Sequence, residues 1–281
     1  MHLPPKHVET HVPTLRQLIR DNPLGVLVTA LPSPNHPTIQ CTHIPWILDV
    51  ADEADEAELG TLRGHLARMN PHSKALAEAA SPDSNSNSNS SSNSSSNSSS
   101  NSSDGRPANG PIEAEVSVLF TAADHAYVRP QFYVATKPTT GKVVPTWNYA
   151  AVQAYGRARV YCDGADPATA EFLRRQLGDL SRHAEGHVAG HTGGPGDGAR
   201  EPWKVSDAPE RYVELLSKNI IGIEIRVERL EGKWKMSQEM GEEDRKGVAA
   251  GFAALGTDNG AAMARMVEER AALAAKKRGD S

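Results

Sequence analysis

Alternating hydrophobic and polar positions predict a series of strands along the chain. The apolar run at residues 24–31 is typical of a buried strand, and residues 38–48 alternate as its hairpin partner. Two more strands are expected at residues 59–66 and 115–120. After a short turn, residues 125–130 should pair with the strand at 115–120.

At residues 141–160 a loop feeds a long strand rich in β-branched and aromatic side chains. Residues 220–238 alternate as well. Because Glu231 and Gly232 interrupt that alternation, we expect a hairpin of two strands that turns there.

A period of 3.6 residues predicts helices between these strands. Leu15, Leu18 and Ile19 share one face of the first helix, which should end before Pro23 because the residue before a proline avoids the α region. Further helices are expected from residue 71, at 167–183, at 207–219 and at 242–277, the last broken near 256–260. The expected N-caps are Thr14, Asn70 and Asp207.

Strands interrupted by helices predict an α+β fold built on an antiparallel barrel. Residues 84–103 contain only Ser and Asn, so they lack the apolar side chains that offset the entropy of ordering. We therefore expect one domain at residues 1–245, interrupted by a disordered insert at 81–111, and a helical tail at 246–281.

The formal net charge of −5 gives no reason to expect a polyanionic partner, and no helix-turn-helix pattern is visible, so direct DNA binding is not expected. Two cysteines, Cys41 and Cys162, are too few for a disulfide scaffold. No secretory signal and no membrane-spanning apolar run is visible. These features predict a cytoplasmic protein with free thiols.

Residues 141–160 also carry candidate chemistry. Lys142, Thr146, Trp147 and Asn148 place a cation, a hydroxyl, a flat ring and an amide close together, which suits a flat, phosphate-bearing ligand. The alternative is an ordinary packing strand, with Trp147 in the core and Lys142 in solvent.

A second candidate site falls at the junction between the strand at 59–66 and the following helix. His65, Arg68, Asn70 and Lys74 gather there, and a helix N-terminus with nearby cations can bind a phosphate. Ordinary capping and surface charge explain the same residues.

Three histidines, His183, His187 and His191, recur four residues apart, a spacing that would stack metal ligands on a continuous helix. Gly186 and Gly190 argue against such a helix, so no metal site is expected.

Four segments together resemble the PaiB family, described as FMN-binding, negative transcriptional regulators. They are LRGHLARMNP (62–71), GKVVPTWNYAAVQAYG (141–156), IIGIEIRVERLEGKWKMSQ (220–238) and DRKGVAAG (244–251). The resemblance implies an FMN-binding split β-barrel of Greek-key type, a homodimer, and a cofactor site at the subunit interface.

The resemblance also implies which residues hold the cofactor. The expected phosphate ligands are Thr42, His43, His65, Arg68 and Lys74. The expected contacts of the flavin ring are Thr146, Trp147 and Asn148, with Lys235, Ser237 and Gln238 reaching it from the partner subunit. Lys142, a candidate from the motif itself, joins these cofactor-binding residues. No catalytic acid, base or nucleophile is evident, so whether the flavin serves an oxidoreductase or a sensor stays open.

Two alternatives remain beside FMN. Other split barrels hold haem, so haem b could bind here with His43, His65 or His125 as the iron ligand. The protein could also be a transcriptional regulator without enzymatic activity.

Overall fold

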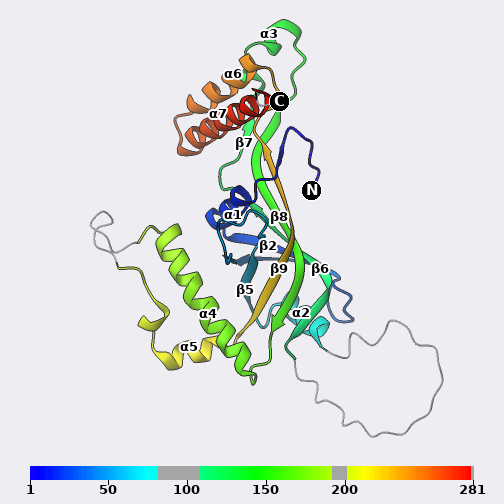
Figure 1. Ribbon diagram of the computed structural model, residues 1–281, viewed down its shortest axis with the longest axis vertical. Coiled ribbons are helices and arrows are strands. Elements are labelled where there is room, and N and C mark those ends of the chain that lie inside the picture. The colour runs from blue at the N-terminus through cyan, green and yellow to red at the C-terminus, as the bar shows by residue number, and fades with distance from the viewer. Residues whose placement is uncertain (82–107, 192–200, 280–281) are drawn as a thin grey trace, which may run out of the picture. The chain divides into compact units, whose positions relative to one another are not determined.

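The computed structural model describes residues 1–81, 108–191 and 201–279, and the side chains of 277–279 are not described. The predicted Ser/Asn-rich insert at 81–111 therefore lies largely outside the described residues. The strands are β1 Val8–Glu9, β2 Leu24–Ala30, β3 Ile39–Pro45, β4 Ile47–Asp49, β5 Thr61–Ala67, β6 Gly110–Thr121, β7 Ala126–Val128, β8 Thr146–Tyr161 and β9 Ile220–Lys235 (Figure 1). The helices are α1 Val12–Asp21, α2 Pro71–Ala80, α3 Thr136–Thr140, α4 Pro167–His183, α5 Glu210–Ser217, α6 Glu242–Ala253 and α7 Asp258–Gly279.

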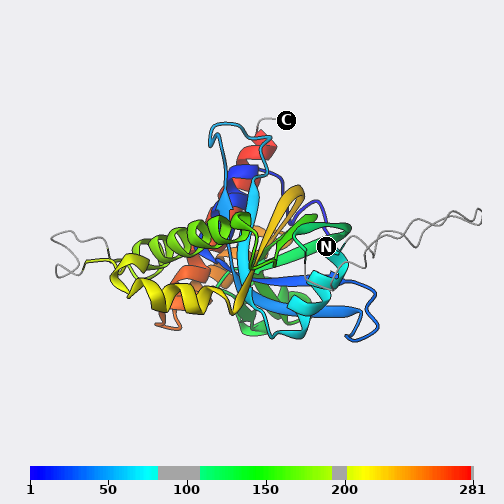
Figure 2. The ribbon, with the colours of Figure 1, turned by 90° about the horizontal axis from the view of Figure 1, so that it is seen from below.

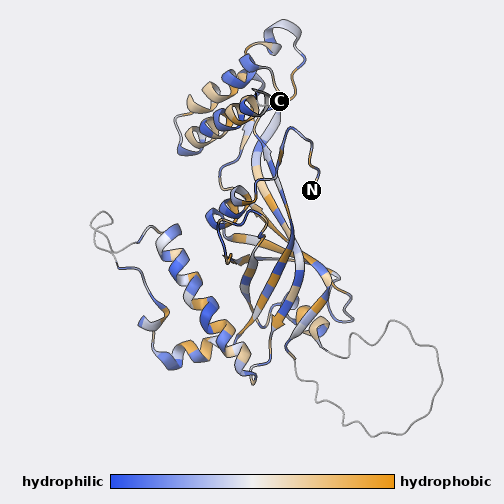
Figure 3. Cartoon of the chain, in the orientation of Figure 1, coloured by the Kyte–Doolittle hydropathy of each residue, from blue (hydrophilic) through white to orange (hydrophobic). Residues whose placement is uncertain are grey.

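The strands form one sheet with the order β3-β2-β6-β8-β9-β5-β4, while β1 pairs with β9 and β7 pairs with β8. The pairs of known register are all antiparallel: β1 with β9, β2 with β3, β4 with β5, β5 with β9 and β7 with β8. Figure 3 shows hydrophobic and hydrophilic residues alternating along these strands. The predicted α+β fold, an antiparallel split barrel with peripheral helices and a helical C-terminal region, is confirmed.

Contacts divide the chain into two compact units, and the long strands β6, β8 and β9 contribute residues to both. The first unit comprises residues 1–22, 119–153 and 230–281, and the second comprises residues 23–118 and 154–229. The predicted division into a domain at 1–245 and a tail at 246–281 stays a prediction.

The core of the second unit lies where β3 and β5 approach each other. Ile44, Trp46 and Leu62 are all buried there. A Cβ atom at Gly64 would lie 3.0 Å from the Ile44 side chain and 3.1 Å from the Trp46 ring. Glycine at this position therefore lets the two strands close on the indole. On the other side of β5, α4 and α5 lie side by side in both ribbon views (Figures 1 and 2).

The helices α6 and α7 contribute much of the core of the first unit. The buried side chains of these helices are Val248 and Phe252 of α6 and Met263 and Val267 of α7. The rings of Phe252 and Phe132 meet edge to face, with 5.4 Å between their centroids. The break that separates α6 from α7 falls at residues 254–257, as the Gly-containing segment predicted.

The prediction that residues 125–130 pair with β6 was wrong. Ala126 and Val128 of β7 are instead registered with Asn148 and Thr146 of β8. Both neighbours of β6 are already occupied, by β2 and β8. The Ala122 amide donates to the Ala150 carbonyl, so the first residues of β8 extend past the end of β6 and leave an edge that β7 fills.

The predicted hairpin at residues 220–238 was also wrong, because β9 is one strand of 16 residues. The N-terminal arm supplies its partner: Val8 is registered with Lys233, and Glu9 with Gly232. A Cβ atom at Gly232 would lie 2.2 Å from the Leu15 side chain, so this glycine serves close packing against α1 and makes no turn.

Of the three predicted N-caps, only Asn70 is confirmed, since its side chain accepts a hydrogen bond from the His72 amide at 3.0 Å. The first helix begins at Val12 and not after Thr14, and the Thr14 hydroxyl pairs with His11 Nδ1 at 2.8 Å. Asp207 ends a short 3₁₀ turn, so α5 begins after Pro209. In α1, Pro13 occupies the first helical turn, where its fixed φ is already helical.

Candidate cofactor site

The start of β8 and the end of β9 bring together several predicted ring contacts in the first unit. Lys235 Nζ donates to the Thr146 hydroxyl and to the Trp147 carbonyl oxygen, the latter at 3.2 Å. Burial lowers the pKa of the Lys235 ammonium, although nearby Glu239 opposes this effect. We call Thr146, Trp147 and Lys235, with their neighbours His125 and Tyr127, the ring-side cluster.

The Trp147 indole lies on the opposite face of β8 from Thr146, because successive side chains of a strand alternate. It is 49% exposed, and its Nε1 donates to His125 Nδ1 at 3.2 Å. The ring of Tyr127, 45% exposed, lies 6.1 Å from the indole between centroids. The expectation of a core tryptophan is therefore wrong, and the cluster presents an aromatic surface to solvent.

A buried pair supports this cluster. Asn148 Nδ2 donates to the Ser237 hydroxyl at 3.1 Å, and both residues are fully buried. Ser237 has a φ of 62°, the one left-handed residue other than glycine in the described part of the chain. Such a backbone conformation costs about 1–3 kcal/mol and persists where the surroundings hold it. The pair thus fixes the turn that follows Lys235.

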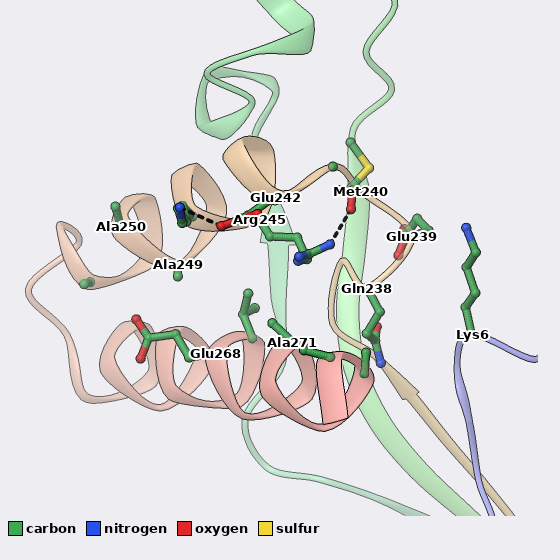
Figure 4. A pocket seen from close by; sticks show the side chains of 16 residues that line it. Lys6, Gln238, Glu239, Met240, Glu242, Arg245, Ala249, Ala250, Glu268 and Ala271 are labelled. Atoms are coloured by element: carbon green, nitrogen blue, oxygen red, sulfur yellow. Dashed lines mark hydrogen bonds and ion pairs between the residues drawn. The ribbon is translucent and has the colours of Figure 1, made fainter. Parts of the chain in front are cut away.

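Gln238 lies in the same turn, and its side-chain amide forms hydrogen bonds with main-chain atoms of the protein. Its Nε2 donates to the Trp234 carbonyl at 2.6 Å, and its Oε1 accepts from the Met236 amide at 2.6 Å. It lines a cavity of about 930 Å³ between α6, α7 and the turn, where Arg245 donates to the Met240 carbonyl (Figure 4). Lys142 is exposed in the loop before β8.

The strand-to-helix junction of the second unit is organised differently. His72, which the sequence reasoning missed, is buried between two hydroxyl groups: Thr42 Oγ1 lies 2.8 Å from its Nδ1, and Thr29 Oγ1 lies 2.9 Å from its Nε2. Burial lowers the pKa of His72 to about 4. We call Thr29, Thr42 and His72 the histidine clamp.

Arg68 is bound by main-chain carbonyl groups. Its Nε donates to the Lys218 oxygen at 3.0 Å, its Nη1 to the Cys162 oxygen at 2.8 Å and its Nη2 to the Ile220 oxygen at 3.1 Å. The guanidinium therefore ties the end of β5 to residues that follow β8 and begin β9. A role in phosphate binding would have to use its remaining donors.

The other predicted phosphate ligands do not gather. His43 is exposed on the face of β3 opposite to Thr42, and Lys74 is exposed on the first turn of α2. His65 points from β5 toward α4, on the same face as Arg63. In the part of the chain that the structure describes, no hydrogen bond joins any two of Thr42, His43, His65, Arg68 and Lys74.

Sequence reasoning also missed Arg63, whose side chain is only 1% exposed. Its Nη2 donates to Asp49 and to Asp179, both at 2.8 Å, and its Nη1 donates to Gln176 at 3.3 Å. This ion pair joins α4 to β4 and β5. Only the period-2 pattern of β5, which puts residue 63 under α4, could have indicated it.

The helical turn that follows α4 stacks the rings of His183 and His187 at 5.0 Å, whereas His191 pairs with Glu185 at 3.0 Å. Among the residues described, no three His, Cys, Asp or Glu side chains are placed to hold a metal ion.

Within the described ranges, no helix combines the length and the apolar character needed to cross a membrane.

The antiparallel split barrel, with an aromatic and a desolvated ammonium at the ends of its long strands, defines a cofactor-binding α+β protein. Residues 1–229 match the family described as "Putative FMN-binding domain", and the chain belongs to this family. FMN is the cofactor that this membership supports. The predicted resemblance to the PaiB family is confirmed.

The chain is also similar to individual proteins. An uncharacterized protein of Aspergillus fumigatus is 50% identical over 282 residues, covering 99% of this chain and 100% of its own. The protease synthase and sporulation protein PAI 2 of Bacillus subtilis is 28% identical over 157 residues, covering 56% of this chain and 63% of its own. The structure of the flavocytochrome Anf3 from Azotobacter vinelandii is 14% identical with a TM-score of 0.35, covering 82% of this chain and 71% of that one, a likeness too low to carry an argument.

Proposed function

We propose that the protein binds FMN with the isoalloxazine ring against the ring-side cluster, and that it acts in a redox or regulatory role as a homodimer. The observation that carries the proposal is the half-exposed Trp147 indole, with the Lys235 ammonium of β9 bound to the main-chain carbonyl of the same residue. An aromatic face can stack on a flat ring, and a cation can pair with the acceptor atoms along its edge.

The donor set of the cluster fits this cofactor. Thr146 and the Trp147 carbonyl orient the Lys235 ammonium, and burial has already removed part of its hydration. The ammonium therefore gives up less hydration free energy when it binds a ligand. When bound, FMN supplies the electron-transfer chemistry, while the residues of this chain bind the ring, orient it and set the charge beside it.

Thr42 and Lys74 stay predictions as phosphate ligands. His43, His65 and Arg68 stay predictions as phosphate ligands, as do Lys142, Asn148, Ser237 and Gln238 as ring contacts.

The test is a visible absorption spectrum of the purified protein, followed by FMN titration. We expect flavin bands near about 370 and 450 nm, and saturable binding that Lys235→Met weakens about tenfold, since a charged hydrogen bond is worth about 1.5–3 kcal/mol. Lys276→Met, on the exposed face of α7, is the matched control and should bind FMN like the parent.

Failure to bind FMN by a folded protein would contradict the proposal. The family match gives no support to the haem b alternative with His43, His65 or His125, and the absence of an intense band near about 400 nm after haem addition would remove it. Light scattering would test the homodimer, which should weigh twice the chain.

A further inference from the structure

A second cavity, of about 650 Å³, lies within the second unit on the outer side of β5. Side chains of α4, α5 and the segment before α5 line it, and most are apolar or aromatic: Leu177, Leu180, Trp203, Tyr212 and Leu216. The last three are about half exposed, so the cavity is open to solvent on this side. This volume falls in the range of about 300–1,000 Å³ that is typical of small-molecule sites. His65 of β5 lines its inner wall.

The polar side chains of the lining are mostly committed to the main chain. Ser181 donates to the Trp203 carbonyl, Ser217 to the Val213 carbonyl and Asn219 to the Leu215 carbonyl. His65 differs, because its Nδ1 is buried and has no hydrogen-bond partner within the described residues. Because Nδ1 is closed off from the cavity, a ligand would pair with the other ring nitrogen, Nε2, which has no hydrogen-bond partner within the described residues either.

The charge of the lining restricts the ligand further. Among the residues that the structure describes, the lining includes the Glu185 carboxylate, which accepts from the Trp203 amide at 3.3 Å and from His191 at 3.0 Å, and it includes no Lys or Arg side chain. Burial lowers the pKa of His65, so its imidazole is neutral at neutral pH and offers a hydrogen bond without a charge. An anion would meet a carboxylate and no cation.

We propose that this cavity is a binding site for an uncharged, flat aromatic molecule that places one hydrogen-bonding group against His65. Trp203 and Tyr212 supply aromatic walls, and Leu177, Leu180 and Leu216 supply apolar contacts. The site differs from the one proposed for FMN, whose phosphate is an anion that this lining does not suit. It therefore adds a second ligand to the proposed function.

Calorimetric titration with two probes of the same ring tests the proposal on the full chain. 2-Naphthol is neutral and carries one hydroxyl group, whereas 2-naphthoate carries a negative charge in its place. We expect saturable binding of one 2-naphthol per chain, and binding of 2-naphthoate at least about tenfold weaker. Equal or tighter binding of the anion would overturn the assigned ligand class.

Variants locate the binding. His65→Leu should weaken 2-naphthol binding roughly five- to tenfold, the value of one hydrogen bond, while His2→Leu on the exposed N-terminal arm should not. Ala208→Trp should fill the cavity and abolish binding, with the exposed Ala54→Trp as control. Ala67→Phe fills the cavity from β5 and serves if Ala208→Trp does not fold.

Absence of saturable 2-naphthol binding would overturn the proposal, and so would binding that survives in both filled variants. An affinity that falls as protein concentration rises would assign the cavity to a second copy of the chain instead. FMN content, measured on the same Ala67→Phe and Ala208→Trp proteins, should stay at the parent level. Loss of FMN together with 2-naphthol would show that the two sites are one.

Discussion

The ring-side cluster of the first unit and the strand-to-helix junction of the second unit both gather polar side chains at strand ends, but they use them differently. At the junction, the three guanidinium nitrogens of Arg68 bind main-chain oxygens, and both ring nitrogens of His72 face hydroxyl groups. In the ring-side cluster, the face of Trp147 remains exposed.

This difference separates polar groups that hold the fold from groups that can bind a ligand. A side chain whose hydrogen bonds are satisfied internally loses them if it turns to a ligand, whereas an exposed aromatic face gains contacts at little cost. Variants of the second unit should therefore reduce stability, and variants of the ring-side cluster should reduce FMN affinity.

The largest expected effect is on stability, from Arg63→Leu. Removing the guanidinium breaks its buried hydrogen bonds to Asp49, Asp179 and Gln176, which should lower the free energy of unfolding by about 3 kcal/mol. The loss is limited because Arg175 and Arg182 still pair with the two carboxylates. Urea unfolding measures it. Arg157→Leu removes an arginine that is 61% exposed from its pair with Glu228, and should cost less than about 1 kcal/mol. Equal losses of unfolding free energy in Arg63→Leu and Arg157→Leu would contradict a stabilising role for the buried Arg63 ion pairs.

The histidine clamp predicts a dependence of stability on pH. The folded-state pKa of His72, about 4, lies below its ordinary value of 6.5, so the unfolded chain binds the proton more readily. Stability from this group is complete above pH 6.5 and is lost as pH falls toward 4. Between about pH 7.5 and 4.5 the parent should lose about 2–3 kcal/mol more than His72→Gln does. The free energies are measured by urea unfolding. If they fall equally with pH in the parent and in His72→Gln, His72 is not the source of the pH dependence.

Arg68→Ala should cost about 2 kcal/mol of unfolding free energy, because carbonyl groups of Cys162, Lys218 and Ile220 lose a charged donor. Arg129→Ala, at an exposed position, is the control for loss of charge. If Arg68→Ala keeps its stability but loses FMN, the guanidinium is a phosphate ligand and the contrast between the two regions fails.

The smallest effect on stability should come from Trp147→Leu, which changes unfolding by less than about 1 kcal/mol because the indole is 49% exposed. FMN affinity should nevertheless fall about tenfold through lost stacking. Ile39→Ala, at another exposed apolar position, should change neither FMN affinity nor stability appreciably. A Trp147→Leu protein that binds FMN normally would place the ring elsewhere.

Local patterns predicted those elements whose cause is local. Asn70 caps α2 because its side chain and Pro71 sit in sequence where a helix begins, and β8 forms where β-branched and aromatic residues accumulate. Lys235 contacts Thr146 and the Trp147 carbonyl within one chain, whereas the resemblance implied that it reaches the flavin ring from the partner subunit.

Features that depend on distant segments escaped prediction. Gly232 looks like a turn residue until α1 and β1, from the start of the chain, are known to pack on it. His72 is unremarkable in sequence because its partners Thr29 and Thr42 come from β2 and β3. Arg68 was predicted to bind a phosphate because the main-chain carbonyl groups that it binds cannot be recognised from the amino-acid sequence.

Asp244 of α6 also has a consequence for how fragments of this protein should be cut. Its carboxylate accepts hydrogen bonds from the Ala135 and Thr136 amides, so α6 caps α3 and steadies the segment that leads into β8. The family match ends at residue 229, before α6. A fragment trimmed to that boundary loses the acceptor, and its Ala135 and Thr136 amides should exchange with deuterium faster than those of the full chain.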